Sequence, residues 1–187
     1  MLNRKTFIIA EAGVNHNGKI KLAYQLIDAA KKAGADAVKF QIFKTENYIV
    51  KKAKLAEYQK KNIKNIKNQF DLIKKYELSE NDILKVIRYC KKKKILSLFS
   101  PFDIWGINYL IKKKFNIIKI PSGEIASYKY LKHLAKFNKK LILSTGMAKL
   151  DEIKTLVLDN PNNMELGKKV RNLFPLDEVG ENQIKLF

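Results

Sequence analysis

Two lysines stand inside otherwise apolar segments of the sequence. Lys39 interrupts the run from Ala37 to Phe43, and Lys119 interrupts the run from Ile117 to Ile120. A buried lysine without a partner is destabilising, whereas a lysine at the mouth of a site can face an anion. Together with hydroxyl groups and glycine backbone amides, two such lysines suit a phosphate or a carboxylate. The alternative is that both side chains point outward between helices and extend their ammonium groups into solvent.

Polar side chains also follow the other apolar segments. Two carboxylates, Glu11 and Glu124, could act as an acid, as a base or as acceptors for a sugar hydroxyl. The further candidates are one amide and three hydroxyl groups, those of Gln41, Ser100, Ser122 and Ser144. The alternatives are that the glutamates cap helices or pair with the lysines, and that Ser122 and Ser144, like Thr145, satisfy backbone groups of turns. The recurrence of such residues at five segment ends favours a common site.

The other reactive residue types have simpler interpretations. We expect His16 to form local hydrogen bonds in a turn, His133 to lie on a helix surface, and Trp105 to pack in a helix. Cys90 is expected to be a small buried hydrophobe, and a single cysteine excludes an intramolecular disulfide. With two histidines and one cysteine, the chain alone cannot build a zinc site of the common Cys/His type.

Short apolar segments alternate with amphipathic helices along the chain. Five strands are predicted, at residues 7–10, 37–43, 95–100, 117–120 and 141–143. Helices are predicted at about 19–33, 79–93, 103–113, 127–137 and 149–158. Between the second strand and the second helix lies a Lys-, Asn- and Gln-rich connection, residues 44–78, which predicts short helices and no strand. Such strand–helix alternation is typical of a parallel sheet.

This alternation fits a (β/α)8 barrel or a doubly wound sheet. No GxGxxG follows the first predicted strand, which argues against a dinucleotide-binding sheet. The polar residues at the strand ends favour the barrel, because its catalytic groups lie at the carboxyl ends of the strands. A complete barrel needs about 250 residues, and the chain has 187. We therefore expect an α/β fold of the TIM-barrel type, truncated after about five β/α units.

The composition excludes several classes of protein. The chain is 46% hydrophobic, as expected for one globular domain. Its net charge of +20 could indicate a nucleic acid partner, but the lysine runs 91–94 and 112–114 lie at helix ends, where cations are favourable. No nucleic-acid-binding motif accompanies the charge. No apolar run is long enough for a membrane span and no secretory signal is present, so we expect a cytoplasmic protein without nucleic acid or membrane partners.

Four motifs give the chain a family resemblance. In this order they are IIAEAGVNHNGKIKLAYQLIDAAKKAGADAVKFQ, LFSPFD, IKIPSGE and ILSTGM. They resemble the amino-terminal barrel of the sialic acid synthase family, which includes N-acetylneuraminate, legionaminate and pseudaminate synthases. The resemblance covers about residues 6–155. It implies that residues 1–158 form the amino-terminal part of a synthase TIM barrel, that the tail 159–187 does not match the family, and that the family's carboxyl-terminal antifreeze-like domain is absent.

The resemblance implies an enzyme of carbohydrate biosynthesis. The family condenses phosphoenolpyruvate with an N-acetylated amino-sugar aldehyde of the N-acetylmannosamine type, giving a nine-carbon 2-keto sugar acid and phosphate, often for cell-surface polysaccharides. By resemblance, Gln41 and Glu124 face the sugar and the reacting centre, and Glu11 lies near a metal-bound water. The residues implied to bind phosphoenolpyruvate are Lys39, Ser100, Lys119, Ser122 and Ser144.

The resemblance also implies what is missing. The family uses Mn²⁺ or Mg²⁺, held by two histidines on later strands, and neither His16 nor His133 falls at those positions. We therefore expect no metal ligands in this chain and a catalytically incomplete enzyme. The resemblance further implies that the full-length family forms homodimers. The alternative is a non-catalytic anion-binding fragment, or a half-barrel that needs a partner chain. A Schiff-base aldolase using a strand lysine is a further possibility, which the order of the four motifs argues against.

Overall fold

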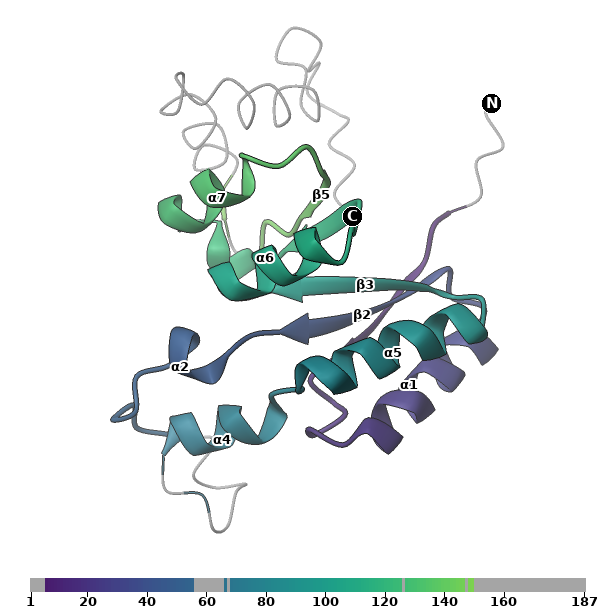
Figure 1. Ribbon diagram of the computed structural model, residues 1–187, viewed down its shortest axis with the longest axis horizontal. Helices are drawn as coiled ribbons and strands as arrows, with labels where there is room; N and C mark the ends of the chain where they lie inside the picture. Colours follow the sequence, from purple (N-terminus) through teal and green to yellow (C-terminus); the bar gives the residue numbers. More distant parts are fainter. Residues whose placement is uncertain (1–5, 56–65, 67, 126, 147, 150–187) are drawn as a thin grey trace, which may run out of the picture. The chain divides into compact units, whose positions relative to one another are not determined.

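The described residues form an α/β structure with five strands in two sheets, each sheet with parallel pairing (Figure 1). The computed structural model describes residues 6–55, 66, 68–125, 127–146 and 148–149. The chain divides into two compact units, residues 1–110 and 111–187. All five predicted strands are confirmed, each within two residues of its predicted start.

The first unit contains a three-stranded parallel sheet in the order β1–β2–β3. Its strands are β1 (Ile9–Gly13), β2 (Ala37–Ile42) and β3 (Leu96–Pro101). The first strand begins and ends later than predicted, so that Glu11 lies within β1 and not after it. The reason is the pairing with β2: Ile9 is the first residue of β1 with a partner in the ladder, opposite Ala37.

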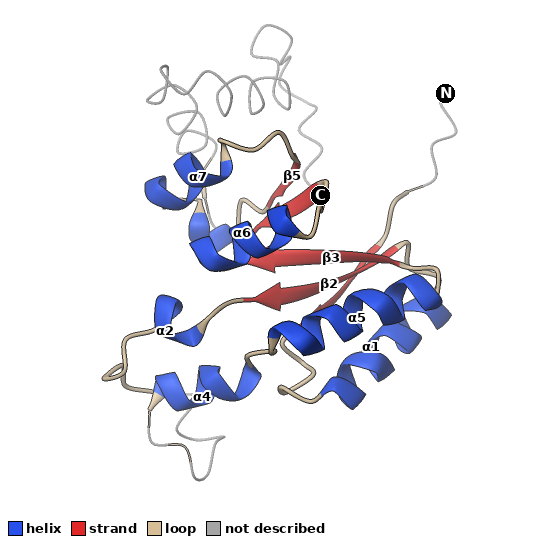
Figure 2. Ribbon diagram, in the orientation of Figure 1, coloured by secondary structure: helices blue, strands red, loops and turns tan. Residues whose placement is uncertain are grey.

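Two amphipathic helices cover one face of this sheet. They are α1 (Ile20–Lys32) and α5 (Glu80–Lys92), which lie side by side (Figure 2). Their apolar positions recur at helical spacing, so each helix buries one stripe. Because side chains alternate along a strand, Val38 and Phe40 point to the same face as Phe99, and all three are fully buried. The opposite face of the sheet therefore carries Lys39 and Gln41.

The connection between β2 and α5 contains the short helices α2 (Thr45–Tyr48) and α4 (Gln69–Tyr76). Short helices were predicted here, and the described residues of the connection contain no strand. After β3, helix α6 (Ile104–Lys112) leads from the first unit into the second.

The second unit contains the parallel pair β4 (Ile117–Ile120) and β5 (Lys140–Leu143). A short 3₁₀ helix, η1 (Ser122–Glu124), and helix α7 (Tyr128–Leu134) connect the two strands. Buried side chains of β4 and α7 contribute to the core, namely Ile118, Ile120, Tyr130, Leu131 and Leu134. The predicted helix at 149–158 and the tail 159–187 lie outside the described residues, apart from Lys149. Within the described part of the chain, no helix is long and apolar enough to cross a membrane.

Candidate active site

Four of the predicted site residues share one face of the β1–β2–β3 sheet. Glu11 is paired in register with Lys39, and Gln41 with Ser100. Residues opposite each other in a parallel sheet point to the same side, as do residues two apart along one strand. The face opposite helices α1 and α5 therefore carries all four side chains. This position excludes the alternative in which Lys39 points outward between helices.

The ammonium group of Lys39 is at the centre of this group. It forms an ion pair with the Glu11 carboxylate and donates a hydrogen bond of 3.3 Å to Oγ of Ser100. Lys39 is only 7% exposed and Ser100 is fully buried, whereas the Glu11 side chain is 54% exposed. An ammonium has three donors, so it can serve Glu11, Ser100 and an oxygen of an incoming anion together. The arrangement thus suits a site that receives an anionic ligand next to a solvent-accessible carboxylate.

Gly13 lies close to both the Glu11 carboxylate and the Gln41 amide. Its backbone has a φ of +52°, and the ladder is irregular between Glu11 and Gly13. A Cβ at this position would lie 3.1 Å from Oε1 of Glu11 and 3.7 Å from Nε2 of Gln41. A side chain here would therefore crowd both groups. Sequence reasoning did not single out Gly13, although a glycine two residues after a catalytic-type carboxylate is a signal for such close packing.

The second unit brings together two loops that carry predicted residues. Ser122 opens η1 two residues after the end of β4, and Gly146 follows β5. A Cβ on Gly146 would lie 2.5 Å from Cβ of Ser122 and 3.0 Å from its Oγ, so the two loops are in close contact. Ser144 continues the ladder, because its N–H donates to the carbonyl of Ile120 at 3.1 Å.

The other two candidates of this unit lie at the same end of the sheet. Lys119 is opposite Ile142 in the ladder, one residue before β4 ends. The backbone N–H of Glu124 donates to the carbonyl of Pro121 at 3.0 Å, which closes the turn after β4. The eight predicted residues thus fall into two sets of four, one on the strands of the first sheet and one on β4 and in the turns after β4 and β5. That the two sets form one site stays a prediction.

His16 has the local structural role predicted for it. Nδ1 of its ring accepts a hydrogen bond of 3.0 Å from the N–H of Gly18, and the ring lies 6.0 Å from that of Phe40. Its Nε2 atom is buried without a hydrogen-bond partner among the described residues. Burial lowers the pKa of His16 from 6.5 to about 4. The ring is therefore neutral at pH 7 and belongs to the core.

The remaining reactive side chains also have structural positions. Cys90 is buried, and burial raises the pKa of its thiol to about 12, so the thiolate nucleophile is not formed at neutral pH. His133 is half-buried in α7 with its ring 5.5 Å from that of Phe137. Burial, followed by the nearby charge of Lys136, lowers the pKa of His133. Trp105 packs against Tyr109, as predicted, with 5.3 Å between the ring centroids.

A metal site does not form from the described residues. Within residues 6–55, 66, 68–125, 127–146 and 148–149, no three side chains of His, Cys, Asp or Glu lie close enough together to hold an ion. These side chains therefore do not fit the divalent metal implied by the resemblance.

Sequence reasoning missed two buried carboxylates that contact the segment after β2, Glu77 and Asp103. Asp103 was interpreted only as the beginning of a helix, and Glu77 lay in a connection without a distinctive pattern. Asp103 follows Ser100 in the segment Ser-Pro-Phe-Asp. An aspartate three residues after a site serine, at the junction of a strand and a helix, is a signal that could have identified it.

Comparison with known proteins gives a consistent set of relatives. The model of a family described as the NeuB family matches residues 26–165. The N,N'-diacetyllegionaminic acid synthase of Campylobacter jejuni is 51% identical over 150 residues, which are 80% of this chain and 45% of the relative. The synthase of the same name from Legionella pneumophila is 44% identical over 151 residues, 81% of this chain and 42% of the relative.

A solved structure agrees with these relatives. The N-acetylneuraminic acid synthetase from Leptospira borgpetersenii, determined in complex with citrate, superposes with a TM-score of 0.70 and 32% identity. The match covers 90% of this chain and 52% of that protein. The chain thus spans less than half the length of the two curated relatives and about half that of the solved structure.

Proposed function

The chain belongs to the NeuB family, and on that premise we propose that it forms the first β/α units of a sialic acid synthase barrel. Its relatives are named as synthases of legionaminic, pseudaminic and sialic acids and as a spore coat polysaccharide biosynthesis protein. These names support a sialic acid synthase-like function in carbohydrate biosynthesis. The five parallel strands are consistent with a TIM barrel that continues beyond them.

The reaction that we propose joins phosphoenolpyruvate to an N-acetylated amino-sugar aldehyde. Carbon C3 of phosphoenolpyruvate forms a bond with the aldehyde carbon, water adds at C2, and phosphate leaves from C2. The three carbons of phosphoenolpyruvate and the six of the sugar give a nine-carbon 2-keto acid. The observation that carries this proposal is the buried Lys39 ammonium between the Glu11 carboxylate and the Ser100 hydroxyl.

The proposed roles follow the charges of the reactants. Lys39 and Ser100 bind an anionic group of phosphoenolpyruvate, because the ammonium and the hydroxyl are buried together. Lys119, Ser122 and Ser144 are assigned to the rest of the same ligand. Gln41 and Glu124 face the sugar and the reacting centre, and the exposed Glu11 carboxylate accepts a proton from the attacking water.

A turnover assay tests this function. The chain is incubated with phosphoenolpyruvate, N-acetylmannosamine and Mn²⁺, and released phosphate is measured against a Lys119→Ala control. Release that depends on Lys119 supports the synthase. Phosphate release equal in both proteins would contradict the assignment of Lys119, because its ammonium is proposed to bind the reacting ligand.

Phosphate release together with thermal stability distinguishes the synthase from a second candidate function. The chain spans 45% of its Campylobacter jejuni relative, so a non-catalytic anion-binding fragment, or a half-barrel that acts with a partner chain, is the alternative. Thermal stabilisation by phosphoenolpyruvate without phosphate release would favour this alternative. The homodimer, the domain boundary near residue 158 and the use of Mn²⁺ or Mg²⁺ stay predictions, and a metal would need ligands from outside the described residues.

A further inference from the structure

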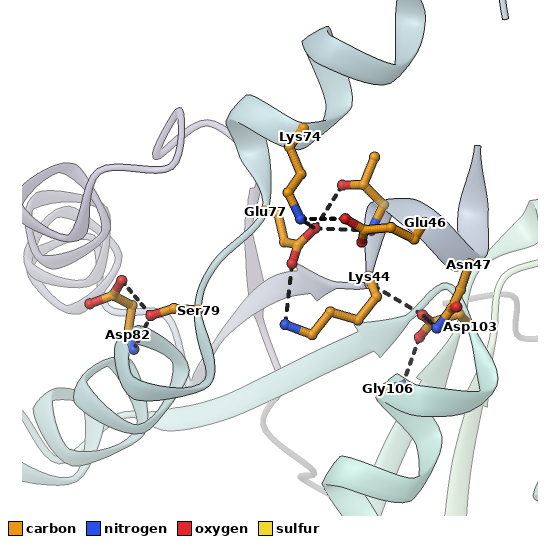
Figure 3. Close-up of polar contacts among 10 residues, drawn as sticks. Lys44, Glu46, Asn47, Lys74, Glu77, Ser79, Asp82, Asp103 and Gly106 are labelled. Atoms are coloured by element: carbon orange, nitrogen blue, oxygen red, sulfur yellow. Dashed lines mark hydrogen bonds and ion pairs between the residues drawn. The ribbon is translucent and has the colours of Figure 1, made fainter. Parts of the chain in front are cut away.

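The segment that follows β2, residues Lys44–Tyr48, is held by two carboxylates from distant parts of the first unit (Figure 3). The first is Asp103, which is 7% exposed and lies between β3 and α6. Its Oδ2 accepts hydrogen bonds from the backbone N–H of Lys44 at 3.0 Å and from Nδ2 of Asn47 at 3.1 Å. Its Oδ1 accepts from the backbone N–H of Gly106 at 2.7 Å and so caps the beginning of α6.

The second carboxylate is that of Glu77, which lies between α4 and α5 and has a side chain only 9% exposed. Its Oε2 accepts from the backbone N–H of Thr45 at 2.9 Å and from the Thr45 hydroxyl at 2.8 Å. Its two oxygens also form ion pairs with Nζ of Lys44 at 3.2 Å and of Lys74 at 2.9 Å. Two successive backbone N–H groups after β2 thus donate to carboxylates from two different segments.

This segment is continuous with the strand ends that carry the site. The backbone N–H of Phe102 donates to the carbonyl of Ile42 at 3.0 Å, which extends the contact of β2 and β3 beyond the ladder. Gln41 lies three residues before Lys44, and Ser100 three residues before Asp103. A change in the position of Lys44 or Asp103 is therefore expected to shift Gln41 or Ser100, each only three residues away along the chain.

The charges make this arrangement cooperative. A buried carboxylate is destabilising unless donors compensate it. The donors that compensate Asp103 and Glu77 come largely from Lys44–Tyr48. The segment and the two carboxylates therefore become ordered together. Loss of the segment would leave Asp103 with only the N–H of Gly106 and Glu77 with only the ammonium of Lys74, so both charges would be poorly compensated.

We infer that Asp103 and Glu77 are positioning residues, which hold Lys44–Tyr48 and so fix Gln41 and the Lys39–Ser100 pair for phosphoenolpyruvate. Neither carboxylate is assigned a contact with the ligand. This inference rests on the proposed phosphoenolpyruvate site, but its first step, the ordering of the strand ends, is measured without any ligand.

Asp103→Asn is the informative substitution. The amide oxygen of the asparagine can still cap α6 through Gly106, whereas its NH₂ group would face the donors of Lys44 and Asn47. Asp82→Asn is the matched control, because the Asp82 carboxylate at the beginning of α5 accepts a hydrogen bond from Ser79 (Figure 3). The same carboxylate forms an ion pair with Lys85. Asn47→Ala is the milder second variant, since Asn47 is exposed and its loss leaves the core intact.

Amide hydrogen exchange is measured first, on the intact chain without ligand. In Asp103→Asn, exchange at Lys44, Thr45 and Phe102 is expected to become at least about tenfold faster, with a smaller change in the same direction in Asn47→Ala. Exchange at these amides should be unchanged in Asp82→Asn. Unchanged exchange in both Asp103→Asn and Asn47→Ala would overturn the inference, whether or not the chain binds phosphoenolpyruvate.

Affinity for phosphoenolpyruvate is measured next, by calorimetry. Asp103→Asn is expected to weaken binding about tenfold, which is about 1.4 kcal/mol, with no change in Asp82→Asn. In a Lys39→Ala background, Asp103→Asn should have no further effect, because the two substitutions act through the same ammonium. Wild-type affinity in Asp103→Asn, despite faster exchange, would overturn the positioning role. Absence of binding by the wild-type chain would contradict the proposed function instead, and the exchange result would still decide whether the carboxylates hold the strand ends.

Discussion

Lys39 and His16 are both buried polar side chains, but their surroundings differ. Lys39 meets the Glu11 carboxylate and the Ser100 hydroxyl. His16 meets the N–H of Gly18 and the ring of Phe40, and burial lowers its pKa to about 4. The positive charge of Lys39 is therefore compensated, whereas a positive charge on the His16 ring would not be. This difference separates a side chain suited to anion binding from one that belongs to the core.

The pKa of His16 predicts a pH dependence of folding. Protonation favours the unfolded chain, because the folded-state pKa of about 4 lies below the ordinary histidine value of 6.5. Stability that is present above pH 6.5 is lost as the pH falls toward 4, by at most about 3 kcal/mol. In His16→Asn this part of the pH dependence should disappear, although the variant is less stable at pH 7. Urea unfolding of both proteins at pH 7, 5.5 and 4 measures this difference. If the free energy of unfolding falls equally with pH in wild type and in His16→Asn, His16 is not the responsible group.

At the scale of elements, the loops after β4 and β5 depend on one glycine. Gly146 has a φ of +49° and lies against Ser122, whereas Gly123, the neighbour of Ser122, has open space around the position of a Cβ. The left-handed backbone and the close approach both require glycine at position 146. The two glycines therefore form a matched pair for testing how the loops meet.

Gly146→Ala is expected to destabilise the chain by about 1–3 kcal/mol, because the new methyl group would strain the backbone and displace Ser122. Gly123→Ala should change the free energy of unfolding by less than about 0.5 kcal/mol. Chemical denaturation of both variants measures these values. Equal destabilisation by the two substitutions would contradict the claim that the close approach to Ser122 requires glycine at position 146.

At the scale of the whole molecule, the sequence predicts the strands better than the contacts between segments. Apolar periodicity located all five strands, and the parallel alternation placed Lys39 and Ser100 on adjacent strands. The hydrogen bonds that join Asp103 and Glu77 to Lys44–Tyr48 could not be predicted, because the partners are far apart in the sequence. Asp103 is 59 residues from Lys44, and Glu77 is 32 residues from Thr45. Periodicity reports which side of an element is buried, whereas such contacts depend on which elements meet.

The same limit explains the difference at β1. The apolar run begins at Phe7, but Phe7 and Ile8 are about half exposed and precede the ladder. Two N–H groups, those of Asp36 and Ala37, donate to the carbonyl of Ile8 and lead into the pairing with β2. The register that follows places Glu11 within the strand, opposite Lys39. The ion pair of the site is therefore a consequence of strand pairing and not of the apolar pattern alone.

The most direct test of the account is a calorimetric titration of the chain with phosphoenolpyruvate. Wild type is compared with Lys39→Ala and with Lys32→Ala, whose side chain is exposed in the last turn of α1. The account predicts that wild type and Lys32→Ala bind with the same affinity and that Lys39→Ala loses at least about tenfold. Equal binding by Lys39→Ala and wild type would contradict the central claim, because the buried ammonium would then have no part in holding the anion.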